Sequence, residues 1–340
     1  MTSLAELIQN EDVVALTFRQ KLQSVDEPDV PIFPPTYPVG KGESRHRYDT
    51  PYTINEDGDG LLICDLDTVQ SQANRMEAAF SDDLADLVPQ HAVKAGNAVV
   101  PLTALSHRVA DAAIRATDLN DTIREAFRSF LAGDPLPLAK LAPTSFVFGA
   151  WDSRDTSAKV PRAIRSEIRA FDVAVLTKSA LFSGSFSQPD LGLTDEEWEK
   201  AAKKGLASTP SVDAHGGILV KGDILQTASI HLGALRRFGH TAQGDLLPRY
   251  LLGLALAGLV ASGRDYNLRS GCWLVLDGAP EWRTVSRSGE RQAVELGDVV
   301  TEARDPASEW VKAVEVTLGG EPTIHPFDPK IGKKIAKGQA

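Results

Sequence analysis

Cysteine is scarce, and this scarcity excludes a disulfide framework as the basis of the fold. The 340 residues contain two cysteines, Cys64 and Cys272. Both lie in apolar stretches, LLICDL and GCWLVL, where buried reduced thiols are expected. The two cysteines are too far apart in the sequence to match a metal-ligand motif, and the seven histidines are scattered without metal-ligand spacing. The sequence therefore predicts no metal site and no cofactor.

Long apolar runs and nucleotide-binding glycine motifs are also missing. The longest apolar stretch, 250–261, is interrupted by glycines and is shorter than the roughly 18 residues of a membrane span. The start of the chain, MTSLAELIQNEDVV, has no basic region followed by an apolar core, so we expect a cytoplasmic protein without a signal peptide. Neither GxGxxG nor GxxxxGK[ST] occurs, which disfavours a doubly wound nucleotide-binding domain.

Predicted strands and helices are mixed along the chain without regular alternation. We expect strands at 13–25, 61–66, 144–150, 171–182, 270–276 and the end of 293–319, and helices at 68–80, 106–117, 121–132, 160–170 and 246–262. This mixture favours an α+β fold, with an antiparallel sheet in a single domain covering 1–340. The expected insertions lie at 26–60 and 81–140, a peripheral helix and loop at 187–212, and a flexible basic tail at 330–340.

The predicted helix at 68–80 has an unusual polar face. Its apolar residues Val69, Ala73, Met76 and Phe80 recur once per turn. The other positions hold neutral amides, a hydroxyl and one arginine, namely Gln70, Ser71, Gln72, Asn74 and Arg75. Asp67 and Gln70 fit a capping box at its start. Such side chains suit phosphate, ribose or base edges, and the alternative is a polar face packed against another segment.

A basic stretch follows at 151–171, WDSRDTSAKVPRAIRSEIRAF. Lys159, Arg162, Arg165 and Arg169 recur every three or four residues, and on a helix they form one stripe. The net charge of −10 argues against a nucleic-acid binder unless basic residues are segregated, as they are here. The stripe favours contact with a phosphate backbone, and the alternative is a solvated face with local salt bridges.

Several segments together resemble a known family. DLDTVQSQANRMEAAF, SHRVADAAIR and FVFGAWDSRDTSAKVPRAIRSEIRA are similar to the backbone subunit of type I CRISPR interference complexes (Cascade). The resemblance is narrower to the subtype G branch, formerly U, within the RAMP superfamily. TFRQKLQSV and FPPTYPVG fit the same branch. The matched segments spread over about 13–182, and the combination of QSQANR with FGAWDS and KVPR is specific.

The resemblance implies an RRM-like, ferredoxin-like antiparallel palm with thumb and web insertions. It implies that copies of the chain stack into a helical filament along a CRISPR guide RNA (crRNA), which then pairs with target DNA. The implied partners are end-capping CRISPR-associated subunits and a recruited helicase-nuclease, with no membrane. The chain itself is expected to be no enzyme.

A subunit that holds any guide must bind the RNA backbone and leave the Watson–Crick edges free. Neutral amides, hydroxyls and scattered cations meet that requirement. The residues that we expect to contact RNA are Arg19, Lys21, Gln70, Ser71, Gln72, Asn74, Arg75, His107, Arg108, Lys159, Arg162 and Arg169.

Two other functions remain open. One is a backbone subunit of the type III kind that cleaves RNA with a metal and a loop aspartate, for which Asp152, Asp155 and Asp213 are the candidates. The other is a protein-only scaffold subunit, whose polar helix packs against a partner.

Overall fold

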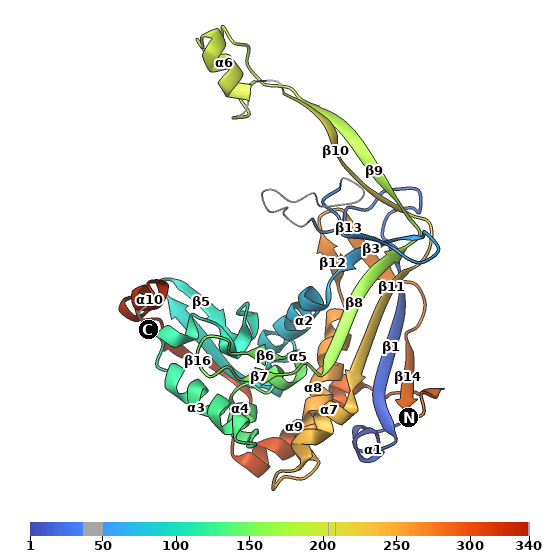
Figure 1. The fold of residues 1–340 in the computed structure, drawn as a ribbon, viewed down its shortest axis with the longest axis vertical. Coiled ribbons are helices and arrows are strands. Elements are labelled where there is room, and N and C mark those ends of the chain that lie inside the picture. Colours follow the sequence, from blue (N-terminus) through green and yellow to red (C-terminus); the bar gives the residue numbers. More distant parts are fainter. Residues whose placement is uncertain (37–49, 203, 208, 339–340) are drawn as a thin grey trace.

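A curved antiparallel sheet forms the centre of the molecule in the computed structural model (Figure 1), which describes residues 1–36, 50–202, 204–207 and 209–338. The strands lie in the order β12-β13-β1-β11-β8-β3-β2, with β14 beside β1 and β15 beside β14. Their bounds are β1 Val13–Ser24, β2 Ile54–Glu56, β3 Leu62–Asp67, β8 Ile164–Phe171, β11 Ile224–His231, β12 Tyr266–Arg269, β13 Cys272–Leu276, β14 Glu281–Ser286 and β15 Arg291–Ala293. The predicted α+β class is therefore confirmed.

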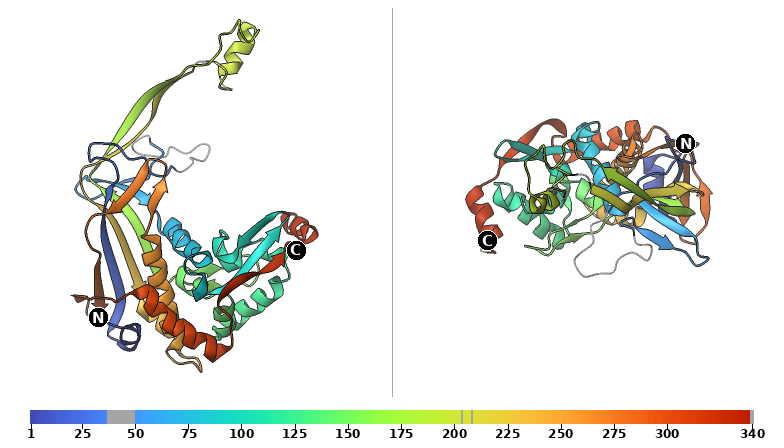
Figure 2. Two further views of the ribbon diagram at one scale, coloured as in Figure 1. Left: turned by 180° about the vertical axis from the view of Figure 1, so that it is seen from behind. Right: turned by 90° about the horizontal axis from the view of Figure 1, so that it is seen from above.

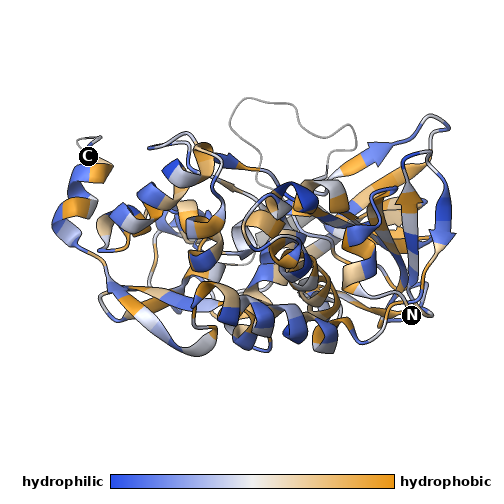
Figure 3. Cartoon of the chain, turned by 90° about the horizontal axis from the view of Figure 1, so that it is seen from below, coloured by the Kyte–Doolittle hydropathy of each residue, from blue (hydrophilic) through white to orange (hydrophobic). Residues whose placement is uncertain are grey.

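Helices cover one face of this sheet. They are α1 (Leu4–Gln9), α2 (Val69–Ala78), α7 (Leu232–Arg236), α8 (Leu246–Ser262) and α9 (Val299–Val314). Because α8 is apolar on nearly all sides, it is buried along most of its length, and Figure 3 shows hydrophobic residues gathered at the centre, where α8 lies. Tyr250 of α8 stacks on Trp310 of α9 with ring centroids 5.5 Å apart. In the residues described, no helix is long and apolar enough to cross a membrane.

The predictions for 13–25, 61–66, 68–80, 121–132, 171–182, 246–262 and 270–276 are confirmed in element type. Both cysteines are free and buried, as expected. Burial raises the pKa of the Cys64 thiol well above its usual range and that of Cys272 to about 12. The two thiols are therefore protonated core residues.

The helix predicted at 160–170 is wrong. This segment forms the short strand β7 (Lys159–Val160) and the sheet strand β8. Ser166, Ile168 and Ala170 are buried in β8, and the charged residues between them point away from the core. The charges therefore follow the period of a strand, although their spacing also fits a helix.

Three further element predictions are wrong. The expected strand at 144–150 is helix α5 (Thr144–Phe148) followed by the two-residue strand β6 (Ala150–Trp151), because a short buried apolar run fits either state. The expected helix at 106–117 holds only isolated 3-10 turns, and Arg108 adopts φ +54°. The strand expected at the end of 293–319 is mostly α9.

A second lobe lies beside the main sheet. It contains a three-stranded sheet in the order β16-β4-β5 and three helices. These elements are β4 Pro89–Ala95, β5 Ala98–Pro101, α3 Asn120–Leu131, α4 Leu136–Leu141, β16 Gly319–Pro326 and α10 Pro329–Ala336. The segment 81–140 thus contributes packed structure to this lobe, and the described part of the expected basic tail is largely helical.

One hairpin projects far from the body (Figures 1 and 2). It consists of β9 (Val173–Phe182) and β10 (Thr209–Val220), with α6 (Asp195–Ala202) near its outer end. We call residues 173–220 the arm. The arm includes the segment 187–212 that the sequence predicted to be peripheral. The other predicted excursion, 26–60, falls partly outside the described residues.

Candidate nucleic-acid interface

Six of the residues predicted to bind RNA line one open cleft of about 700 Å³. They come from three separate segments: α2, the turn that begins at Arg108, and the β6–β7 region. The six are Gln70, Asn74, His107, Arg108, Lys159 and Arg162, and they are joined by Ser106, Phe148, Gly149, Ala150, Trp151, Ser153, Val160 and Pro161.

Hydrogen bonds hold the amide side chains of this cleft in place. Arg162 Nη2 donates to Gln70 Oε1 at 2.9 Å, and Arg162 Nε donates to the carbonyl of Phe148 at 3.2 Å. Gln70 Nε2 in turn donates to Asn74 Oδ1 at 3.1 Å. Burial lowers the pKa of Arg162, and the nearby Arg108 lowers it further. Arg162 therefore orients Gln70 and connects α2 with the strand β6 region.

Arg108 is a buried connector, in contrast to the exposed cation expected from the sequence. Its Nη2 donates to Asn74 Oδ1 at 3.1 Å, and its Nε pairs with the buried carboxylate of Glu77. Burial raises the pKa of Glu77 to about 7, and the guanidinium opposes that rise. Arg108 thus holds the Asn74 side chain in place from a buried position. Other residues of the cleft are therefore better placed to contact a ligand.

The exposed lysine of the cleft is accompanied by an exposed indole. Trp151 is 61% exposed, and Lys159 Nζ lies 5.7 Å from the centroid of its ring. His107 is exposed beside Asp111, at 3.5 Å. Many proteins bind single-stranded nucleic acid with an exposed aromatic ring next to a cation. A base stacks on the ring, and the cation contacts a phosphate. Trp151 was missed as a site residue, although its place in FGAWDS next to the basic stretch was an available signal.

Gly149 permits the close approach of β6 to β7. Its φ is +81°, and a Cβ added there would lie 3.2 Å from the Arg162 backbone nitrogen and 3.3 Å from the Val160 carbonyl oxygen. Glycine therefore brings Trp151 and Lys159, which are directly paired across the two strands, to the edge of the cleft.

The exposed polar face predicted for α2 is wrong at Gln72. The Gln72 side chain is buried, and its Nε2 donates to Asp67 Oδ2 at 2.7 Å. Its Oε1 accepts from Ser166 Oγ at 2.8 Å and from Gln226 Nε2 at 2.9 Å. Gln72 thus joins α2 to β8 and β11 inside the protein.

Two other α2 residues also have internal roles. Arg75 Nε pairs with Asp67 at 2.9 Å, and Arg75 Nη2 donates to the Leu268 carbonyl at 2.8 Å, which links α2 to β12. Asp67 is not the helix cap that the sequence suggested, because Thr68 accepts the bond from the Ser71 amide. Ser71 itself is half-buried and does not line the cleft.

The remaining predicted cations lie on the outer face of the main sheet. Arg19 and Lys21 share one face of β1, as their alternation predicted. Lys21 sits between Asp223 at 3.0 Å and Asp277 at 3.4 Å, and the bond to Asp223 is the main cause of its raised pKa. Arg169 pairs with Asp65 and Glu167, each at 3.0 Å, so it is separate from Lys159 and Arg162.

The candidate catalytic aspartates are engaged in local structure. Asp152 is buried and accepts from the Thr156 amide and hydroxyl at 2.8 and 2.7 Å. Asp155 pairs with Arg124 at 2.6 Å. The side chain of Asp213 falls outside what the structure describes. Among the residues that are described, no three His, Cys, Asp or Glu side chains form a group able to hold a metal ion.

Comparisons with known proteins connect the chain with CRISPR systems. A search of curated proteins found no match. A structure titled "CRISPR RNA-guided surveillance complex, pre-nicking" is similar at a TM-score of 0.37 and 12% identity, over 96% of this chain and 99% of that chain. The family model described as CRISPR-associated protein GSU0053 matches residues 16–175, just under half of the chain. The matched segment contains α2, the β6–β7 region and all of the residues that line the cleft.

Proposed function

We propose that the chain is a non-catalytic crRNA-binding subunit of a type I Cascade complex. One observation carries the proposal: two amides of α2 converge on one cleft with an exposed lysine and an exposed indole of the distant β6–β7 region. The family match over residues 16–175 is consistent with this role.

The cleft suits RNA of any sequence. Lys159 supplies a phosphate contact, and Trp151 supplies a ring on which any base can stack. Gln70 and Asn74, held by Arg162 and Arg108, offer donors and acceptors to ribose hydroxyls and phosphate oxygens. None of these contacts requires a particular base edge, so the guide remains free to pair with target DNA.

The proposal extends to assembly. Copies of the chain line up along the guide as the backbone of a subtype G complex, with end-capping subunits and a recruited helicase-nuclease. In this proposal the main sheet with α2 and α8 is an RRM-like palm, and the arm is the thumb. The arm suits such a role because α6, at its outer end, lies far from the rest of the chain in Figure 1 and in the left view of Figure 2.

The test measures binding of fluorescently labelled RNA of two unrelated sequences to the full chain. Lys159→Gln removes one phosphate contact, so we expect weaker binding to both sequences and a salt dependence shallower by about 0.7 in log–log slope. Trp151→Ala is expected to weaken both by about 1–3 kcal/mol for each stacked base. Matched controls are Lys312→Gln on α9 and Trp273→Ala on β13, both exposed residues outside the cleft.

Three results would contradict the proposal. Binding that equals the controls in both cleft variants would remove the cleft from RNA binding. No RNA binding by the unaltered chain would favour the scaffold function. Cleavage of the RNA with Mg²⁺, abolished by Asp152→Asn, Asp155→Asn or Asp213→Asn, would favour the type III-like enzyme.

A further inference from the structure

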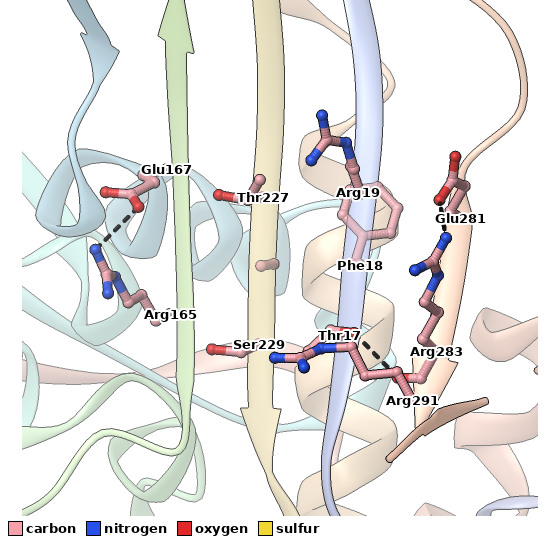
Figure 4. Close-up of a pocket in the computed structure, with 11 residues that line it drawn as sticks. Thr17, Phe18, Arg19, Arg165, Glu167, Thr227, Ser229, Glu281, Arg283 and Arg291 are labelled. Carbon is pink, nitrogen blue, oxygen red and sulfur yellow. Dashed lines mark hydrogen bonds and ion pairs between the residues drawn. The ribbon is translucent and has the colours of Figure 1, made fainter. Parts of the chain in front are cut away.

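A second basic surface lies on the outer face of the main sheet, where the function proposed above does not use it. It is a shallow groove of about 640 Å³ formed across β14, β1, β11 and β8 (Figure 4). We call it the sheet groove. Its polar lining residues are Thr17, Arg19, Arg165, Glu167, Thr227, Ser229, Glu281, Arg283 and Arg291.

The sheet register arranges these side chains in two rows. In the first row, Thr17 of β1 is opposite Arg283 of β14 on one side and Ser229 of β11 on the other, and Ser229 is opposite Arg165 of β8. Since neighbouring strands lie about 4.8 Å apart, the two arginines at the ends of this row are about 14 Å apart at the backbone. Two hydroxyls lie between them.

The second row places Arg19 between Glu281 and Thr227, and Thr227 is opposite Glu167. Arg291 of β15 adds a further cation, and in Figure 4 its side chain is directed across β1 toward β11. Four arginines thus face two glutamates in a chain whose net charge is −10.

Two of the four arginines have no ion pair within the described part of the chain. Arg165 pairs with Glu167 at 2.9 Å, and Arg283 pairs with Glu281 at 3.0 Å. Arg19 and Arg291 are exposed and pair with no acid among the residues described. In contrast, the next cations along the same face, Lys21 and Arg169, are neutralised by aspartate and glutamate. Among the cations named on this face, the two unpaired ones therefore both lie in the sheet groove.

The sheet groove and the cleft are on opposite sides of the sheet. Ser166 and Gln226 point inward and bond with Gln72 of α2, whereas their chain neighbours Arg165 and Thr227 line the groove. Successive residues of a strand face opposite sides, so a strand of RNA in the cleft does not fill the groove.

We propose that the sheet groove binds a single strand of nucleic acid, by its phosphates, independently of the cleft. Guanidinium groups and hydroxyls are the donors that phosphate oxygens accept. Phe18 is the one large apolar residue in the lining. Its ring packs against that of Trp282, with ring centroids 4.8 Å apart, so it does not project as an anchor for a protein partner. An acidic protein segment is thus the less favoured occupant, since protein interfaces centre on buried apolar or aromatic anchors.

The test uses the full chain with Arg19→Gln and Arg291→Gln combined, which removes the two unpaired cations from exposed positions. The charge-matched control combines Arg128→Gln on α3 with Arg237→Gln after α7, both exposed and outside the groove. Binding of labelled oligo(U) and oligo(dT) of equal length is measured over a salt series, with poly-L-glutamate as a third probe. Both variants are also made in a Lys159→Gln background.

We expect the groove variant to bind several-fold more weakly than the control, with a log–log salt slope shallower by about 1.4, or about 0.7 for each lost contact. The same change in the Lys159→Gln background shows that groove and cleft act independently. If the groove variant loses affinity for oligo(U) alone, the groove binds an RNA strand. If it loses affinity equally for oligo(U) and oligo(dT), the groove binds the phosphate backbone of either nucleic acid.

Two results overturn the groove proposal and leave the cleft proposal unaffected. One is nucleic-acid binding and salt slope equal to the charge-matched control. The other is unchanged nucleic-acid binding together with a loss of poly-L-glutamate binding, which would assign the groove to an acidic protein. Conversely, if Lys159→Gln alone has no effect and the groove variant does, the cleft proposal fails and the groove proposal stands.

Discussion

At the scale of single residues, exposure separates two kinds of polar side chain in α2. Gln70 and Asn74 are exposed in the cleft, whereas Gln72 is buried against the sheet. All three are neutral amides within five positions of each other. Sequence alone does not distinguish them, because a polar side chain is buried only when partners from other segments form hydrogen bonds with it. Here those partners are Ser166 and Gln226, more than 90 residues away.

Replacing Gln72 tests this assignment. Gln72→Ala removes one hydrogen bond from each of the buried groups of Asp67, Ser166 and Gln226. Because these groups lose a partner inside the protein, the free energy of unfolding is expected to fall by about 1–3 kcal/mol. Urea unfolding measures the loss, with the exposed Gln70→Ala as the comparison. The folded Gln72→Ala protein should bind RNA like the unaltered chain. A loss of RNA binding without a loss of stability would show that Gln72 faces the ligand.

At the scale of elements, the sequence predicts those with one dominant signal. The once-per-turn spacing of Ala73, Met76 and Phe80 identifies α2, and the length of the apolar run identifies α8. The predictions fail where two periods fit the same residues. In β8, arginines at 165 and 169 satisfy both a helical stripe and strand alternation, and only the pairing of β8 with β11 and β3 decides between them.

The candidate site could also be predicted only in part. Residue types chosen from three segments do converge on the cleft. What the sequence could not show is which of them are exposed. Arg108 occupies a buried position beside its partner Glu77. Lys21 pairs with Asp223 and Asp277, which lie next to strand ends, and Arg169 pairs with Asp65 of β3 and Glu167 of its own strand. These pairings depend on sheet register and on how α2 packs against the turn at Arg108, neither of which the sequence reveals.

The pairing of β4 with β16 contains a pH-sensitive contact. His91 Nδ1 lies 3.1 Å from His325 Nε2, and His325 Nδ1 lies 2.7 Å from Asp118 Oδ1. Burial lowers the pKa of His91, and His325 lowers it further. Folding therefore favours the neutral imidazole of His91. Its stabilising effect is present above the unfolded pKa of about 6.5 and is lost as pH falls below that value.

We expect the free energy of unfolding to decrease between about pH 7.5 and pH 5.5 by more in the unaltered chain than in His91→Gln. Glutamine can still donate to His325 but does not titrate. Urea unfolding at the two pH values, compared with the exposed His107→Gln, measures the difference. An equal pH dependence in the unaltered and His91→Gln proteins would mean that another group is responsible.

At the scale of the whole molecule, the distribution of charge matters more than its sum. The net charge of −10 suggests a protein that avoids nucleic acid, yet an exposed lysine lies in the cleft and exposed arginines lie in the sheet groove. The acidic remainder includes the first turn of α6, at the outer end of the arm. Such segregation allows local binding of a polyanion while the rest of the surface repels it.

The central proposal is that this chain holds a guide RNA along a row of its own copies. The most direct measurement is sequencing of the RNA that co-purifies when the chain is expressed with a repeat–spacer transcript, with an unrelated transcript as the control. We predict enriched, protected guide RNA whose lengths increase by a constant step, because each added copy covers the same length of RNA. Protein free of RNA, or RNA recovered equally from both transcripts, would contradict this role.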